Sequence, residues 1–188
     1  MFLQFSGWLS ASTVASACQS VLSTEAMLSV LLGSGSQTWN YVGRDVLGQL
    51  GGLLVMSGLT KQTDKNPRQF LWMAHAFQQS SMALLLCTPV LEPTWFMPVA
   101  AMANICSNVS FIAYGSMNAK CIQKLSEREN NVGELYSKLT VTQTLASSAG
   151  LCLGMMVNEV VGSHSYLMFF VLGGVRVFCC NQAVKKVL

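Results

Sequence analysis

Two sets of polar side chains within apolar stretches are the first candidates for chemistry. His75, Gln78 and Gln79 lie three and four residues apart, so on a helix they would share one face. Asn104 and Asn108 lie one helical turn apart in a second apolar stretch. Polar groups inside a membrane are costly and often line a ligand pocket or a path for a solute. They can also form interhelical hydrogen bonds that fix packing, each worth about 1 kcal/mol, and we favour this interpretation.

A pair of adjacent charges is the next candidate. Arg44 and Asp45 stand together, but neighbouring residues on a helix point about 100° apart, so the two side chains do not simply pair with each other. Metal binding at His75 is disfavoured because no second His or Cys lies at ligand spacing. No nucleophile elbow, phosphate loop, zinc-protease or dinucleotide motif is present. We therefore expect no enzyme activity, no metal and no cofactor.

Charge is concentrated in one segment, "ERENNVGELYSKLTVTQ", at 127–143. It carries five of the nineteen charged residues (eleven Lys and Arg plus eight Asp and Glu), whereas 93–119 and 139–158 carry none. Its Asn-Asn pair favours a turn, and its Glu and Lys four residues apart favour a helix start. We predict a solvated helix connection that can dock a partner or a lipid headgroup. The candidate contact residues, including two lysines near the end of the chain, are Asn130, Asn131, Glu134, Lys138, Lys185 and Lys186.

The composition indicates what kind of element must position these residues. Of the 188 residues, 52% are hydrophobic and 10% are charged, against about 25% charged in a typical soluble domain. So few charges cannot coat a soluble surface, and we expect a membrane protein; the alternative is a soluble subunit buried among partners. The net charge of +3 is small and the basic residues form no stripe, so we expect no nucleic-acid partner. The seven cysteines contain no C-x-x-C pair, which disfavours a disulfide framework.

Charge-free windows separated by polar or proline-rich breaks define the predicted elements. A helix needs about 20 mostly apolar residues to cross a bilayer core of about 30 Å. The breaks are "GSGSQ", "TKQTDKNP", "PVLEP" and "NEVVGSHS". They leave six predicted helices, at 11–32, 44–59, 69–88, 94–117, 139–158 and 166–182. No period-two pattern is sustained, so we predict an all-α fold: a polytopic membrane bundle of about six helices, in three helical hairpins, forming one domain over 1–188.

The basic residues support this topology. Nine of the eleven fall on one side of the membrane, in the loops after the second and fourth helices and in the C-terminal tail. This asymmetry is typical of proteins that obey the positive-inside rule. Small residues in "GQLGG" and in Gly150-x-x-x-Gly154 favour close packing between membrane helices.

Four sequence blocks resemble the root UVB-sensitive family. They occur in the order of the family's motifs and cover roughly residues 18–187: "VLSTEAMLSVLLGSG" (Val21–Gly35), "GRDVLGQLGG" (Gly43–Gly52), "NNVGELYSK" (Asn130–Lys138) and "NQAVKKV" (Asn181–Val187). In the third helix, the family's Asp and Asn-Asp stand where this chain has His75 and Gln78-Gln79. The family's Thr-Arg-Ala ahead of the charged loop is missing, and "MNAK" stands there.

The resemblance implies a reduced and divergent family member that lacks the family's long extensions. Family members are organelle-associated membrane proteins without an established chemical activity. Plant members are linked to vitamin B6 homeostasis and act in pairs. The resemblance therefore implies a membrane-embedded protein that is not an enzyme, and it does not carry over single residues where the family's polar positions are replaced.

Two functions fit these observations. The first is a non-catalytic accessory or structural subunit of a large organellar membrane complex, such as a respiratory-chain or ATP-synthase complex of the mitochondrial inner membrane. Its partners would be other membrane subunits and phospholipids. The alternative is a small-molecule carrier or binding membrane protein linked to metabolite homeostasis of the vitamin B6 type. A continuous polar cavity would favour the alternative, whereas a tightly packed bundle would favour the subunit.

Overall fold

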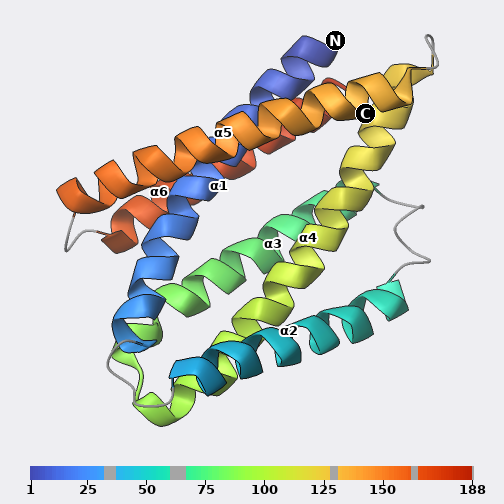
Figure 1. Ribbon diagram of the computed structural model, residues 1–188. Helices are drawn as coiled ribbons and strands as arrows, with labels where there is room; N and C mark the ends of the chain where they lie inside the picture. Colours follow the sequence, from blue (N-terminus) through green and yellow to red (C-terminus); the bar gives the residue numbers. More distant parts are fainter. Residues whose placement is uncertain (32–36, 60–66, 128–130, 162–164, 188) are drawn as a thin grey trace. The chain divides into compact units, whose positions relative to one another are not determined.

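The computed structural model describes residues 1–31, 37–59, 67–127, 131–161 and 165–187. Within these ranges the chain forms six α-helices and two short 3-10 helices, with no strand (Figure 1). The α-helices are α1 (Phe2–Leu31), α2 (Gln37–Leu59), α3 (Pro67–Leu86), α4 (Phe96–Ser126), α5 (Val132–Val161) and α6 (Ser165–Lys185). The prediction of an all-α fold with six helices is confirmed.

Five of the six observed helices are longer than predicted, whereas α3 has the predicted length of 20 residues and lies two residues earlier. α1 starts at Phe2 instead of residue 11 and continues through Glu25 without a break. α4 continues to Ser126 instead of residue 117. Lys120 ends a charge-free window, but lysine is a good helix former and does not end a helix. The windows therefore located the helices but underestimated most of their lengths.

The charged segment at 127–143 contains the predicted helix start, but α5 begins earlier than the predicted residue 139, so the solvated connection is shorter than expected. α5 already begins at Val132, and the Leu135 amide donates to the Asn131 carbonyl over 3.1 Å, as in the first turn of an α-helix. Glu134 lies in that first turn, where the positive end of the helix dipole favours a carboxylate. The connection between α4 and α5 is correspondingly short.

The proline-rich break before α4 is confirmed. Two 3-10 helices, η2 (Thr88–Val90) and η3 (Pro93–Trp95), occupy the stretch between α3 and α4. A proline has no amide hydrogen and its ring clashes with the preceding turn, so an α-helix does not continue through this stretch. The other predicted breaks fall largely on segments outside the described residues, namely 32–36, 60–66 and 162–164.

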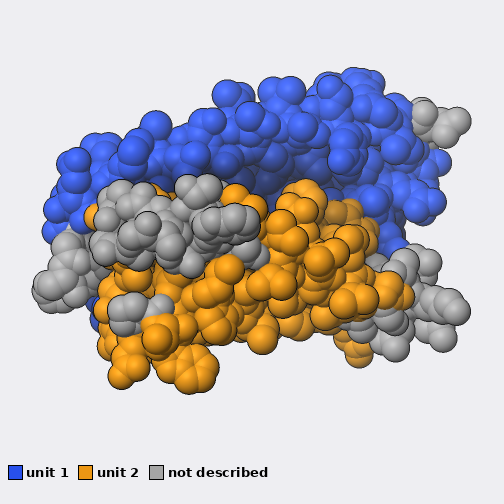
Figure 2. Space-filling model, turned by 60° about the horizontal axis from the view of Figure 1, so that its bottom comes forward, with its two compact units in different colours: residues 1–22, 118–188 blue, residues 23–117 orange. Residues whose placement is uncertain are grey.

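The described helices gather into two compact units. Unit 1 contains residues 1–22 and 118–188, and unit 2 contains residues 23–117 (Figure 2). Both boundaries fall inside a helix, one in α1 and one in α4. Each unit is therefore built from helices of both halves of the chain.

In unit 1, α1 packs alongside α5 at two glycines. A Cβ atom on Gly150 would lie 2.7 Å from the Val14 carbonyl oxygen, and one on Gly154 would lie 2.9 Å from the Val21 side chain. The Cys18 thiol donates to the Gly150 carbonyl over 3.1 Å. The contacts advance in the same order along both helices, so α1 and α5 run parallel. The predicted Gly-x-x-x-Gly packing is confirmed.

Polar side chains of α1 hold α6 in the opposite direction. The Ser12 hydroxyl donates to the Arg176 carbonyl over 3.2 Å, and the Gln19 amide donates to the Phe169 carbonyl over 2.9 Å. Later residues of α1 thus contact earlier residues of α6, so the two helices are antiparallel. Gln19 is fully buried. α1 therefore carries several polar residues that face neighbouring helices.

In unit 2, α2 lies close to α4 because its contact face carries glycines. A Cβ atom on Gly48 would lie 2.5 Å from the Asn104 side chain, and one on Gly52 would lie 2.7 Å from the Asn108 side chain. Only glycine permits this approach without displacing the neighbour. The contacts advance in the same order along both helices, so α2 and α4 run parallel.

α3 packs against α4 as an antiparallel pair. Near the start of α3, Phe70 and Ala74 form a buried cluster with Ala113 of α4. Near its end, Leu85 packs against a cluster that contains Ala100 of α4. Since the contacts advance in opposite orders, α3 and α4 form one of the predicted helical hairpins.

Apolar side chains cover the outer faces of α2, α5 and α6. Leu54, Val160 and Phe170 are 76%, 86% and 72% exposed, respectively. Monomeric soluble proteins rarely expose apolar patches larger than a few hundred Å². Among the described helices, α4, α5 and α6 are each long and apolar enough to cross a membrane. The chain is therefore a multi-pass membrane protein.

Candidate binding site

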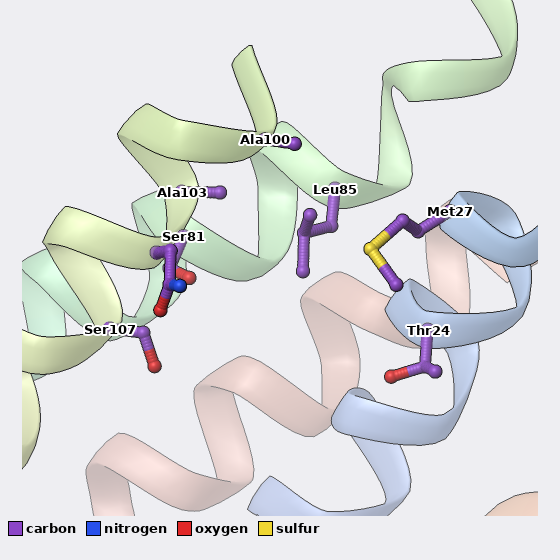
Figure 3. Close-up of a pocket in the computed structure, with 8 residues that line it drawn as sticks. Thr24, Met27, Ser81, Leu85, Ala100, Ala103 and Ser107 are labelled. Carbon is purple, nitrogen blue, oxygen red and sulfur yellow. The ribbon is translucent and has the colours of Figure 1, made fainter. Parts of the chain in front are cut away.

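A cavity of about 240 Å³ lies within unit 2 (Figure 3). Two residues of α1, two of α3 and four of α4 form its wall: Thr24, Met27, Ser81, Leu85, Ala100, Ala103, Asn104 and Ser107. Figure 3 shows Met27 and Thr24 on one side and the small residues Ala100 and Ala103 on the other. The alanines leave space because they reach only a short way from α4. The volume lies below the roughly 300–1,000 Å³ of sites for drug-sized ligands, which suits a single-ring compound.

The cavity wall holds hydroxyl groups with unused hydrogen-bonding capacity. Within the described part of the chain, the hydroxyls of Thr24, Ser81 and Ser107 have no hydrogen-bond partner. Elsewhere, hydroxyls such as those of Ser116 and Thr140 donate to the carbonyl one turn back on their own helix. A hydroxyl can both donate and accept. The wall can therefore bond a ligand without breaking an existing interaction of these three groups.

Asn104 brings a carboxamide to the same wall in a fixed orientation. Its side-chain amide donates to the Asp45 carboxylate over 2.9 Å, and the Asn108 amide donates to the Asn104 carbonyl oxygen over 3.4 Å. The close approach of α2 at Gly48 brings Asp45 within reach. The structure thus joins three sequence candidates, Asp45, Asn104 and Asn108, into one chain of hydrogen bonds beside the cavity.

The wall favours an uncharged ligand. None of the described residues that line the cavity is Asp, Glu, Lys or Arg. A charged ligand would lose its hydration there without gaining a charged partner, which is costly. Met27 and Leu85 supply apolar surface, and the flexible thioether of methionine adapts to irregular shapes. The cavity therefore suits a small molecule with hydrogen-bonding groups and no net charge.

His75 lies outside the cavity wall and contacts α4. It is 3% exposed, and its Nδ1 lies 2.6 Å from the Tyr114 hydroxyl. The His75 and Tyr114 rings meet edge to face at 5.2 Å, and Trp72 lies on α3 at 6.5 Å from the His75 ring. Within the described part of the chain, no three His, Cys, Asp or Glu side chains gather around a possible metal position. His75 therefore acts as an interhelical packing residue in this structure.

The remaining polar candidates of the membrane stretches do not join the cavity. Gln78 and Gln79 are half-buried on α3, and neither lines the wall. Arg44 belongs to α2, but its side chain lies outside the described residues, as does Asn130. Among the described residues, the polar helix face predicted for His75, Gln78 and Gln79 therefore does not extend to the cavity.

The candidates for partner or lipid contact lie in unit 1. Lys138 Nζ and Glu134 Oε1 form the predicted ion pair at 2.5 Å, with both side chains more than half exposed. Asn131 is half-buried directly before α5, and Lys185 and Lys186 are exposed near the end of α6. Exposure leaves the charged groups available, and their contact with a partner stays a prediction.

Sequence reasoning missed several buried polar residues. Arg176 is 4% exposed in α6, one of the candidate membrane spans, where a cation is costly and usually has a structural or functional role. The sequence feature that could have identified Arg176 is a single basic residue within an otherwise apolar stretch. Gln19 and Tyr114 also form interhelical contacts that were not predicted. The cavity residues Ser81 and Ser107 were missed because serine is too common in membrane helices to stand out.

The fold and the cavity define a helical membrane protein with a small uncharged pocket between its helices. The chain belongs to the root UVB-sensitive family: the family profile described as "vitamin B6 photo-protection and homoeostasis domain" matches residues 1–188. The resemblance found in the sequence blocks is confirmed, and the match extends beyond the predicted 18–187.

Two curated proteins of Arabidopsis thaliana are similar to this chain. Protein root UVB sensitive 3 is 23% identical over 194 residues, which cover 98% of this chain and 43% of the relative. Protein root UVB sensitive 4 is 24% identical over 163 residues, which cover 84% of this chain and 31% of the relative. The chain therefore spans less than half the length of these relatives. No solved structure shows a significant match.

Proposed function

We propose that this chain binds a small, uncharged, single-ring metabolite of the vitamin B6 type in the cavity of unit 2. The observation that carries the proposal is the set of hydroxyls of Thr24, Ser81 and Ser107, which have no partner among the described residues, in a wall whose described lining carries no charged group. The family description, which concerns vitamin B6 photo-protection and homoeostasis, supports the choice of ligand. Pyridoxine suits such a wall because it is a flat ring with hydroxyl groups and a ring nitrogen, without net charge. The proposal involves binding or carriage of the ligand and no chemical reaction.

The wall suggests how such a ring would be held. The hydroxyls of Ser81 and Ser107 would exchange hydrogen bonds with the polar edge of the ring, and Met27 would cover an apolar face. The Asn104 carboxamide is already oriented by its bond to Asp45. A preorganised polar group loses little freedom on binding, which favours affinity.

Equilibrium dialysis with radiolabelled pyridoxine in detergent micelles tests the proposal. The decisive variant is Ala103→Leu, because the longer side chain fills cavity space that the alanine methyl leaves open. We expect Ala103→Leu to weaken pyridoxine binding by at least about tenfold, equivalent to about 1.4 kcal/mol.

The matched control is Ala119→Leu, on the same helix at an exposed position. It makes the same chemical change outside the cavity, so its affinity should equal that of the unchanged chain. Equal weakening of pyridoxine binding in both variants would show that the cavity is not the binding site. Absence of binding by the unchanged chain would reject pyridoxine as the ligand.

The accessory-subunit hypothesis has less support. It rests on the lack of catalytic motifs and on short loops, and the family description concerns metabolite homoeostasis instead of a respiratory-chain or ATP-synthase complex. A location in the mitochondrial inner membrane is likewise a prediction. Native-gel sizing of gently extracted membranes, with mass spectrometry of the band, separates the two functions. Migration with a complex many times larger than the chain's 20.3 kDa would favour the subunit.

A further inference from the structure

Each unit contains the same arrangement around one long helix. In unit 1 the long helix is α1, which runs parallel to α5 and antiparallel to α6. In unit 2 it is α4, which runs parallel to α2 and antiparallel to α3. The two long helices have 30 and 31 residues, and α5, the parallel neighbour in unit 1, also has 30. The internal architecture of one unit therefore matches that of the other.

The parallel contact uses the same residue pattern in both units. Gly150 and Gly154 of α5 occupy this place in unit 1, and Gly48 and Gly52 of α2 occupy it in unit 2. In each case a Cβ atom would lie between 2.5 and 2.9 Å from the long helix. The spacing of four residues puts both glycines of a pair on one helix face.

The antiparallel contact also corresponds. In both units a serine hydroxyl of the long helix donates to a backbone carbonyl of the antiparallel neighbour. Ser12 donates to Arg176 over 3.2 Å in unit 1, and Ser110 donates to Ala74 over 2.8 Å in unit 2. Each long helix therefore makes the same two kinds of contact in its unit: a glycine contact with its parallel neighbour and a serine hydrogen bond with its antiparallel neighbour.

Each long helix contributes nearly the same number of residues to its unit before the boundary between the units is reached. The part of α1 in unit 1 is 2–22, which is 21 residues, and the part of α4 in unit 2 is 96–117, which is 22 residues. The chain order is therefore one three-helix repeat, α1-α2-α3, followed by a second, α4-α5-α6. The two copies exchange their first helices.

The repeat indicates that α1, α2 and α3 also cross the membrane. α2 and α3 pack along α4, and α1 packs along α5 and α6, so crossings by α4, α5 and α6 would place all six helices across the bilayer. The polar groups Ser12 and Gln19 of α1 point toward α6 and bond to its carbonyls. Each copy then has three crossings. Because three is odd, chain order alone puts the starts of α1 and α4 on opposite sides of the membrane.

We propose that the chain is an inverted three-helix repeat that opens its unit 2 cavity to the two sides of the membrane in turn and so carries its ligand across. Repeats of inverted topology are common in secondary transporters, in which a central site gains access to each side alternately. The carrier role rests on the proposed function, since carriage requires a bound ligand. The architecture can be tested without any ligand.

The topology test uses native cysteines in sealed vesicles of uniform orientation. Cys87 and Cys152 are exposed and the other five cysteines are buried. A Cys152→Ser variant therefore presents Cys87, between α3 and α4, to a membrane-impermeant maleimide. A second variant, Cys87→Ser with Cys152→Ser and Leu3→Cys, presents the start of α1. The double serine variant without Leu3→Cys serves as the unlabelled background.

We expect Cys87 to be labelled from one side only and Leu3→Cys from the opposite side only. Labelling of both positions from the same side would overturn the inverted repeat. Binding of pyridoxine could still be intact in that case, because the dialysis experiment does not require sealed membranes. The failure of this inference is therefore distinguishable from failure of the proposed function.

The access test places Ser107→Cys in the double serine background, since Ser107 lines the cavity. A small membrane-impermeant thiosulfonate is applied to either side in separate reactions. We expect modification from both sides. Modification from one side only, or from neither, would mean a pocket that does not alternate, and would overturn the carrier role even if the labelling of Cys87 and Leu3→Cys supported the repeat.

Discussion

At the residue scale, polar side chains of this chain serve two purposes. Some polar side chains already form hydrogen bonds between helices: Gln19 bonds to the Phe169 carbonyl, and Asn104 bonds to Asp45. The hydroxyls of Ser81 and Ser107 face the cavity without a partner in the described part of the chain. The packing interpretation therefore applies to the first group, and the ligand interpretation is our proposal for the second.

Gln19 provides the residue-scale prediction. Replacing Gln19 by Leu keeps the size of this fully buried side chain but removes its hydrogen bond to α6. We expect the free energy of unfolding to fall by about 1 kcal/mol, the usual worth of such a bond between membrane helices. Denaturant unfolding in detergent, followed by circular dichroism, measures the change.

The control for this prediction is Gln69→Leu, which makes the same change at an exposed position of α3. Its free energy of unfolding should equal that of the unchanged chain. If Gln19→Leu were as stable as the control, the buried hydrogen bond would not contribute to the association of α1 and α6.

At the element scale, glycines determine which helices approach closely. α5 contacts α1 at Gly150 and Gly154, and α2 contacts α4 at Gly48 and Gly52. Packing between membrane helices depends on such close contact because lipid removes the hydrophobic drive for helix association. The same small residues that looked unspecific in the sequence therefore define the parallel helix pairs.

Gly150→Ala provides the element-scale prediction. The new Cβ would lie 2.7 Å from the Val14 carbonyl oxygen, a backbone atom that cannot turn aside as a side chain can. We expect a loss of stability of about 1–3 kcal/mol from overpacking. Thermal unfolding in detergent should show a lower midpoint for this variant.

Gly115→Ala on α4 is the matched comparison, because a Cβ atom there meets nothing within 4 Å. Alanine favours helix over glycine by about 0.5–1 kcal/mol, so this variant should be as stable as the unchanged chain or more so. Equal destabilisation by both substitutions would show that helix packing at Gly150 is looser than the distances indicate.

At the scale of the whole molecule, the apolar residues on the outside require a lipid environment. Large hydrophobic side chains are exposed along α2, α5 and α6, including Leu53, Leu145 and Leu167, each more than 60% exposed. A surface of this kind is stable against lipid chains and aggregates in water. A soluble helical bundle carries polar and charged side chains at such outer positions.

The whole-molecule prediction concerns extraction from membranes. We expect the chain to stay in the pellet when membranes are washed with alkaline carbonate and to dissolve only in detergent, because apolar crossings, unlike surface charges, are not released by high pH. Immunoblotting of pellet and supernatant provides the measurement. Release into the carbonate supernatant would contradict an integral membrane protein and would favour the soluble-subunit alternative.

The sequence by itself determined the features that depend on local composition. Long charge-free windows determine membrane helices, prolines determine the break before α4, and the motif blocks determined the family. The Glu134–Lys138 pair was predictable too, because residues four apart on a helix are neighbours whatever the rest of the chain does. Helix ends were less predictable, since polar residues can continue a helix.

Contacts between residues far apart in the chain depend on how the helices pack. Nothing local to Asn104 indicates that Asp45 binds it, and no local pattern separates the cavity residue Ser107 from the many serines bonded within their own helices. These contacts depend on the glycine-mediated approach of helices far apart in the chain. The packing of α1 with α6 and of α4 with α3 is likewise invisible to a sequence window, because the contacting residues are 164 and 36 positions apart, respectively.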